Sequence, residues 1–323
     1  MSSLIWQEPS ATGSRKPTRL TIYVLLVVVT LILGLNWPVM ATGVKSIAPI
    51  WMGALRIGTA AALMVGVALA RRTLVVPPRR DLPIVASMAL FRLTAVTVLV
   101  FTALELVPAG RSSVVVWTTS LWTVPIAAIF LGERMTGARW LGLSLGIAGV
   151  LALFEPWGFD WTEPGVAVGH ILLILAAITN ASTAVHIRAH RWSIAPLDSM
   201  PWQLMAATLI LVVLGFAVEG PPVIDWTSQL IWIVLYQGVL ASGIAFWVQI
   251  VILRNLSVVS TNLTLMAVPV VGVLSSAIIL GEDVTTSLLI GLILVVAGVA
   301  LNLLSDRQKT PDPAEILDPQ EVP

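Results

Sequence analysis

Long uncharged runs of apolar residues are the feature that most constrains this chain. Residues 23–35 and 230–251 contain no charged side chain, and runs near 20 apolar residues are long enough to cross a bilayer as helices. Of the 323 residues, 57% are hydrophobic and 11% are charged, whereas a soluble domain carries about 25% charged residues. The alternating ten-residue blocks that are typical of a membrane barrel are absent. The sequence therefore predicts an all-α membrane protein.

Short charged or Pro- and Gly-rich breaks divide the apolar sequence into ten expected transmembrane helices. The expected spans are residues 20–43, 50–70, 82–104, 109–131, 137–154, 165–187, 198–218, 228–253, 257–280 and 286–305. The first span follows Arg15, Lys16 and Arg19, as the apolar segment of a signal peptide would. Its length and the lack of a small-residue cleavage pattern predict a retained helix. Residues 1–19 and 306–323 are polar and Pro-rich, and we expect both tails to be disordered.

The distribution of Lys and Arg predicts the orientation in the membrane, because cytoplasmic loops carry an excess of these residues. With the N-terminus in the cytoplasm, 14 of the 18 Lys and Arg residues fall on the cytoplasmic side. The remaining four are Lys45, Arg56, Arg92 and Arg111. The sequence therefore predicts that both termini lie in the cytoplasm.

A nine-residue sequence near the middle of the chain is repeated, with changes, near its end. Residues 128–136 read AIFLGERMT and residues 277–285 read AIILGEDVT, which are identical at six of nine positions. The tetrapeptide Ser-Ile-Ala-Pro occurs at 46–49 and at 193–196. These matches predict two copies of a five-helix unit, residues 20–154 and 165–305. Because five is odd, the second copy enters the membrane upside down, and Arg134 is replaced by Asp283 as the positive-inside rule requires.

Inverted repeats are typical of secondary transporters, which bind substrate near the midplane where the two halves meet. A membrane scaffold has no need of two interchangeable halves, and no cluster of nucleophile, base and orienting residue indicates an enzyme. The chain has no Cys, and its three His residues lack metal-ligand spacing, so no metal or other cofactor is expected. The net charge of +1 gives no indication of a nucleic-acid partner. We expect a small-molecule substrate and lipid as the surroundings.

Several short motifs resemble the drug/metabolite transporter superfamily in its EamA-type branch. They are Gly34-Leu35-Asn36-Trp37, Arg56, Leu131-Gly132-Glu133-Arg134, Gly142 with Ala148-Gly149-Val150, Pro269, Leu280-Gly281-Glu282, and Gly291 with Ala297-Gly298-Val299. The resemblance covers nearly all of residues 20–305. It departs from the family pattern at Ser120, where the family has Pro, although Pro125 lies nearby.

The resemblance implies export of small metabolites, often amino acids, by alternating access in the bacterial inner membrane. The chain is most similar to the aromatic amino acid exporters of that branch. The alternatives are an exporter of another neutral metabolite or a drug, and a membrane scaffold that transports nothing. No carboxylate lies deep in an expected span and Lys is scarce, which favours a neutral or zwitterionic solute over a cationic drug or a sugar phosphate.

Arg92 is the first candidate for a substrate contact, because an Arg near the middle of a span is costly and usually faces a cavity or a partner. It would attract a substrate carboxylate. The alternative is a structural Arg that binds helix-end carbonyls or extends to the membrane surface.

The fourth expected span carries Ser113, Trp117 and Ser120 at spacings that place them on one helical face. An offset of 149 residues maps Ser113 and Trp117 onto Asn262 and Met266 in the ninth span. We expect both faces to line a central cavity. The alternative is helix packing, which also uses small and hydroxyl side chains.

The remaining cavity candidates are Asn36, Trp37, Asn180, Tyr236 and Gln237. Pro38 follows Trp37 and removes a backbone hydrogen bond, which is tolerated at membrane depth where the backbone lines a cavity. Aromatic rings would pack against an aromatic substrate or attract its ammonium group. The alternative role for these rings is anchoring at the membrane surface.

Two further features are expected to be structural. Glu133 and Glu282 each follow the end of a span, and we expect them to bind loop donors or the start of the next helix. Gly142, Gly146 and Gly149 are spaced for close helix approach, so spans five and ten are expected to pack together or against a second protomer.

Overall fold

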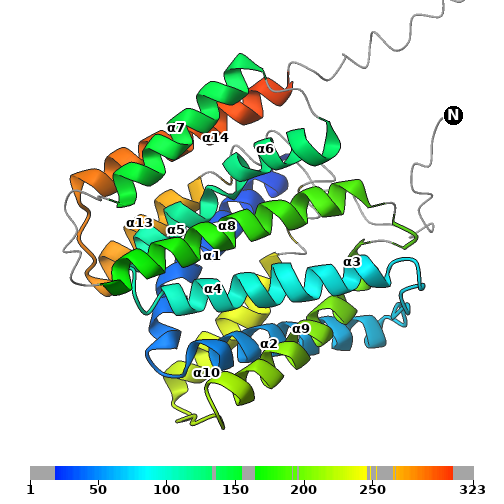
Figure 1. Ribbon diagram of the computed structural model, residues 1–323. Helices are drawn as coiled ribbons and strands as arrows, with labels where there is room; N and C mark the ends of the chain where they lie inside the picture. Colours follow the sequence, from blue (N-terminus) through cyan, green and yellow to red (C-terminus); the bar gives the residue numbers. More distant parts are fainter. Residues whose placement is uncertain are drawn as a thin grey trace, which may run out of the picture.

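The regular structure in the described part of the chain is entirely helical (Figure 1). The computed structural model describes residues 19–132, 136–154, 164–190, 192–194, 196–245, 248, 252, 265 and 267–307. The expected tails at 1–19 and 306–323 and the candidates Asn262 and Met266 therefore lie wholly or almost wholly outside the described residues, as does Glu133.

Parts of the eighth and ninth expected spans, 228–253 and 257–280, lie outside the described residues. The described helices lie close to the expected spans. They are α1 (Arg19–Val44), α2 (Pro49–Ala70), α3 (Leu82–Ser87), η1 (Met88–Ala95), α4 (Val96–Ala103), α5 (Ala109–Trp117), α6 (Thr119–Leu131), α7 (Gly137–Phe154), α8 (Pro164–Ala189), α9 (Pro196–Val218), α10 (Ser228–Leu235), η2 (Tyr236–Ile244), α13 (Ala267–Leu280) and α14 (Thr286–Arg307). Six helical stretches are long and apolar enough to cross a membrane, and four shorter ones are also apolar.

Three of these apolar helical stretches are irregular along their length. α3, η1 and α4 run on without a break, and η1 is a π-helix of 8 residues. η2, a π-helix of 9 residues, continues α10 in the same way. α5 and α6 meet at Thr118, whose backbone N–H donates to the carbonyl of Val115, three residues back, where an α-helix uses the carbonyl four residues back. Wide helical turns of the π type are frequent at functional sites.

The outer surface of the helices is apolar, as a surface in contact with lipid must be. Ile129 on α6 is 76% exposed, Leu209 on α9 is 66% exposed and Ile278 on α13 is 83% exposed. In water such a surface would be strongly unfavourable. The fold is therefore that of an all-helical membrane protein.

The helices pack mainly against helices from the other half of the sequence (Figure 1). α7 packs along α14, α2 packs along α9, and α5 packs against α13. α1 lies against α13, while α8 lies against α6. α2 contacts η2, and α9 contacts η1. Every one of these pairs joins a helix before residue 155 to a helix after it.

Glycines allow α7 and α14 to approach closely within one chain. A Cβ atom on Gly149 would lie 2.9 Å from the carbonyl oxygen of Gly291, and one on Gly298 would lie 2.5 Å from that of Gly142. The backbones therefore touch where larger residues would hold them apart. Spans five and ten were expected to pack together or against a second protomer, and in the structure they pack on each other.

Carboxylates from distant parts of the chain cap the starts of two helices. The Glu282 carboxylate accepts the backbone N–H groups of Ala109 and Gly110 at 2.7 and 2.8 Å. Glu219 accepts those of Ile50 and Trp51 at 2.8 and 3.1 Å. Glu282 was expected to bind loop donors or the following helix, but it caps α5 because α13 packs beside α5.

Candidate functional site

A cavity of about 630 Å³ lies among the helices, where residues of α1, α2, η1, α4, α5, α6, α8, α9, η2 and α13 meet. This volume is typical of pockets that hold small molecules, which span roughly 300–1,000 Å³. The lining is largely apolar, with a few polar groups from separate helices. Such an arrangement suits a small solute with an apolar body and a polar end.

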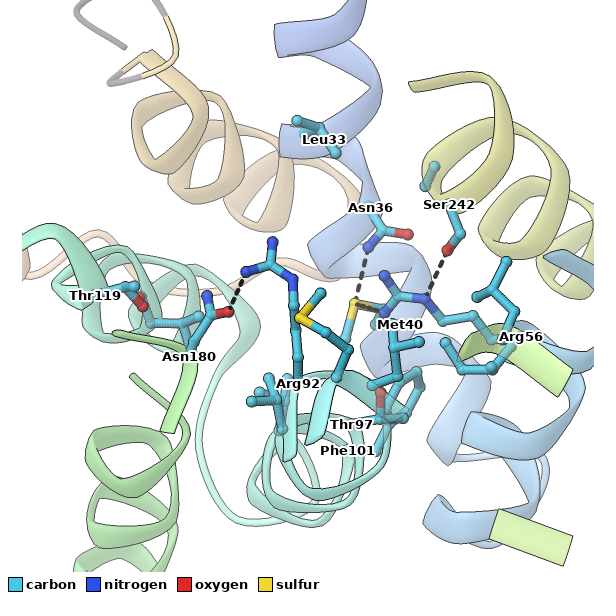
Figure 2. A pocket seen from close by; sticks show the side chains of 18 of the residues that line it. Leu33, Asn36, Met40, Arg56, Arg92, Thr97, Phe101, Thr119, Asn180 and Ser242 are labelled. Atoms are coloured by element: carbon cyan, nitrogen blue, oxygen red, sulfur yellow. Dashed lines mark hydrogen bonds between the residues drawn. The ribbon is translucent and has the colours of Figure 1, made fainter. Parts of the chain in front are cut away.

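Two arginines supply the charge in the lining. Arg92 on η1 donates to Oδ1 of Asn180 on α8 at 3.0 Å. Arg56 on α2 donates through Nε to Oγ of Ser242 on η2 at 3.1 Å, and its terminal nitrogen lies 3.4 Å from Sδ of Met40. Its guanidinium carbon lies 5.8 Å from the centre of the Phe101 ring. Figure 2 shows both side chains reaching toward the segment of α1 that carries Asn36 and Met40.

Asn36 has one satisfied group and one unsatisfied group. Its Nδ2 donates to Sδ of Met40 at 2.9 Å, whereas its Oδ1 is buried and has no partner in the described part of the chain. The residue is only 6% exposed and lines the cavity. A buried acceptor without a partner is costly, so Asn36 offers a ready acceptor to a donor that enters the cavity.

Six of the predicted site residues line this cavity. They are Asn36, Trp37, Arg92, Trp117, Ser120 and Asn180. They come from α1, η1, α5, α6 and α8, so residues far apart in the sequence are brought together. Trp37, Trp117 and Phe101 provide the aromatic part of the lining.

Three other predicted residues lie elsewhere. Ser113 is fully buried, donates to the carbonyl of Gly110 at 2.6 Å and packs beside Gly272 of α13. It does not join Trp117 and Ser120 in the cavity lining, and the helix is interrupted between α5 and α6 at Thr118. Tyr236 donates its hydroxyl to the carbonyl of Ile32 at 2.8 Å, and Gln237 is fully buried next to Gly43.

Arg56 is the main lining residue that the sequence analysis did not propose as a substrate contact. It was noted as a family motif and as one of four arginines and lysines outside the cytoplasmic loops. The signal that singled out Arg92, an Arg inside an apolar span, applies equally to Arg56. Thr97 and Gln203 also line the cavity, but nothing in their sequence context distinguishes them.

Asp81 and the residues after α8 form a polar cluster beside Trp192, which lines the cavity. The Asp81 side chain is fully buried and accepts from the backbone N–H of Ser193 and Ile194 at 3.0 and 3.2 Å. It also lies 3.1 Å from Nε2 of His190. Desolvation raises the pKa of Asp81, but the hydrogen bonds from His190, Ser193 and Ile194 together hold that pKa below its ordinary value.

Relatives with known names are similar over most of the chain. A "Probable terminal-alkyne amino-acid exporter" of Streptantibioticus cattleyicolor is 30% identical over 238 residues, which are 70% of this chain and 74% of that protein. A "Probable amino-acid metabolite efflux pump" of Escherichia coli is 25% identical and covers 88% of this chain and 95% of its own length. The "Uncharacterized transporter YoaV" of Bacillus subtilis is 26% identical, with coverage of 86% and 94%.

A solved crystal structure has the same fold. It superposes with a TM-score of 0.62 at 22% identity and covers 91% of this chain and all of the other. The model of the EamA-like transporter family matches residues 20–154 and residues 167–304. The family and the names of the relatives indicate a transporter rather than an enzyme. The chain belongs to the EamA-like transporter family, whose members are multi-pass membrane proteins, and lies in the bacterial inner membrane.

Proposed function

We propose that this protein is a secondary transporter that exports amino acids, preferably aromatic or other large apolar ones, by alternating access. The observation that carries the proposal is the cavity itself, in which Arg92 and Arg56 lie among Trp37, Trp117 and Phe101. Guanidinium groups bind carboxylates, and aromatic rings pack against aromatic side chains. Two relatives whose printed names refer to amino-acid export support the same substrate class.

Alternating access follows from a chain built as two inverted five-helix repeats, residues 20–154 and 165–305, with ten spans and both termini in the cytoplasm. The family model matches the chain twice, which supports the repeat. The two π-helices in the described residues begin at Met88 and Tyr236, 148 residues apart. Gly132 and Gly281, two of the three glycines at positive φ in the described residues, are 149 residues apart. Irregular turns at matching positions are not expected of unrelated halves.

The helix contacts also support this proposal. If the first repeat is exchanged with the second, the contact of α1 with α13 becomes that of α8 with α6. The contact of α2 with η2 likewise becomes that of α9 with η1. Two halves that make interchangeable contacts can exchange conformations, which yields an outward-open and an inward-open state from one design.

We assign the present arrangement to the inward-facing state. Trp192, Ile187 and Met88 line the cavity toward the predicted cytoplasmic side. On the predicted outer side, Glu219 and Glu282 hold the starts of α2 and α5 through hydrogen bonds. Opening of the outer side would require these hydrogen bonds to move with their helices or to break.

Counterflow in proteoliposomes tests the proposed function. Vesicles loaded with phenylalanine, tryptophan, methionine or threonine should accumulate the labelled form of the same amino acid, and the aromatic ones should exchange fastest. Vesicles without protein provide the control. Exchange of none of the four would rule out free amino acids as the substrates. Repeating the assay with and without an imposed pH gradient distinguishes proton antiport from facilitated exchange.

A further inference from the structure

Among its described lining residues, the cavity carries two positive charges and no negative one. The positive charges are Arg56 and Arg92, and no Asp or Glu lies beside them in that part of the lining. In the described part of the chain, the two side chains are bound by neutral groups alone, the amide oxygen of Asn180, the hydroxyl of Ser242 and the sulfur of Met40. A cation inside an apolar bundle is normally paired with an anion. The missing negative charge is one that a substrate can supply.

The guanidinium groups retain donors for such an anion. Each guanidinium has five N–H groups in a planar fork, and the hydrogen bonds above use one donor of Arg92 and two of Arg56. Figure 2 shows the two side chains approaching the Asn36–Met40 segment from different helices. A carboxylate held there would receive charge-assisted hydrogen bonds, which are stronger than neutral ones.

The unpartnered Oδ1 of Asn36 defines the other half of the site, since it requires an N–H donor. The ammonium group of a free amino acid could donate to it, but the ammonium would add a third positive charge, and no carboxylate among the described lining residues compensates it. The N–H of an acylated amine donates equally well and carries no charge. The site therefore suits a ligand with one carboxylate and one neutral N–H.

We propose that the cavity selects aromatic amino acids whose α-amino group is acylated, so that the ligand is a net anion. The carboxylate binds Arg56 and Arg92, the amide N–H donates to Oδ1 of Asn36, and the ring packs among Trp37, Trp117 and Phe101. The proposal rests on the proposed function of amino-acid export and specifies the form in which the amino acid is recognised.

Equilibrium binding of labelled N-acetylphenylalanine to the full chain in nanodiscs provides the test. Unlabelled N-acetylphenylalanine should compete at least about tenfold better than phenylalanine. N-acetylphenylalaninamide lacks the carboxylate. Phenethylamine also lacks the carboxylate but has the ammonium group. Neither compound should compete for binding. Equal or tighter binding of phenylalanine, or competition by the amide equal to that of the acid, overturns the proposal. The proposal is also overturned if none of these probes binds to the folded protein.

Substitutions in the cavity sharpen the test. Asn36→Asp introduces a negative charge and should shift the ratio of the two affinities toward phenylalanine by about tenfold or more. Arg56→Gln and Arg92→Gln should each weaken the binding of N-acetylphenylalanine by about tenfold. Arg79→Gln should leave the binding unchanged, because Arg79 is an exposed loop residue. Thermal unfolding of each variant establishes that it is folded. An unchanged ratio in folded Asn36→Asp protein overturns the role assigned to Asn36.

The two proposals fail in different ways. If N-acetylphenylalanine binds and is exchanged while none of the four free amino acids is, the export of free amino acids is wrong and the present inference holds. If the free amino acids are exchanged but N-acetylphenylalanine neither binds nor exchanges, the present inference is wrong and the proposed function holds.

Discussion

The carboxylate of Glu282, at the end of α13, accepts the backbone N–H of Ala109, at the start of α5, 2.7 Å away. The same carboxylate accepts the N–H of Gly110. Pro108 occupies the capping position of α5 and has no side-chain acceptor to offer. A residue 173 positions away in the sequence therefore satisfies the first donors of this helix.

Glu282→Ala should lower the free energy of unfolding by about 2 kcal/mol, because two helix-start donors lose a charged acceptor. Glu282→Gln keeps one oxygen acceptor and should cost less. Unfolding in mixed micelles, followed by Trp fluorescence, measures both changes. Asp283→Asn is the matched control, since Asp283 is exposed and its neighbour carries the contacts. Equal effects at positions 282 and 283 would contradict the capping role.

The stability supplied by Asp81 should depend on pH. Its pKa in the folded protein is lowered, although burial opposes the effect of its hydrogen bonds. The stabilisation is therefore fully present above the pKa of the unfolded state, about 3.9, and is lost as the pH falls through the lower folded pKa. Asp81→Asn should unfold at a lower temperature than the wild type at pH 7, and the difference should shrink below pH 4.

Asp225→Asn provides the comparison for this pH series, because Asp225 is exposed. Its unfolding temperature should follow that of the wild type throughout the series. A gap between Asp81→Asn and the wild type that stays constant down to pH 3 would show that the effect is not due to ionisation of Asp81.

The helices were predictable from sequence because lipid imposes an unbroken apolar run on each span. The third span was expected at 82–104 and is Leu82–Ala103. Arg92, Asn36 and Asn180 were predicted to line a cavity for the complementary reason, since a polar side chain in an apolar run is costly and seldom lacks a role. The composition of a single span is sufficient for both conclusions.

Relationships between spans were not predictable in the same way. The grouping of Ser113 with Trp117 and Ser120 assumed one continuous helix, whereas α5 ends at Trp117 and the regular spacing is interrupted at Thr118. The bond from Glu282 to Ala109 depends on how α13 and α5 are placed, and neither residue has a local sequence signal for it. Arg56 meets the same criterion as Arg92, because both are arginines within an apolar span.

Gly298→Ala should destabilise the contact between α7 and α14. The new Cβ would lie 2.5 Å from the carbonyl oxygen of Gly142 and 2.9 Å from the backbone nitrogen of Gly146. Backbone atoms cannot move aside as a flexible side chain can, so we expect a loss of about 1–3 kcal/mol. Gly66→Ala on α2 is the control, because nothing lies within 4 Å of its Cβ position. It should be neutral or stabilise the helix by up to about 1 kcal/mol.

Trp117→Ala and Arg92→Ala should reduce counterflow of phenylalanine while both variants remain folded. Trp117 supplies part of the aromatic lining and Arg92 part of the charge, so each loss removes a substrate contact. Trp232→Ala is the control for removing an indole, since Trp232 is 71% exposed on α10 and lies outside this cavity. Wild-type exchange by both cavity variants would refute the proposed substrate contacts.

Single cysteines test the inverted topology directly, because the natural chain contains none. Thr73 follows α2 and Val223 follows α9, and both are exposed. In two inverted repeats the loops that hold these two residues are equivalent and lie on opposite sides of the membrane, and the positive-inside rule places Thr73 in the cytoplasm. An impermeant maleimide added to intact cells should label Val223→Cys and not Thr73→Cys, and permeabilised cells should label both. Labelling of both variants in intact cells, or of Thr73→Cys alone, would rule out the proposed arrangement, because repeats of five spans must place these two loops on opposite sides.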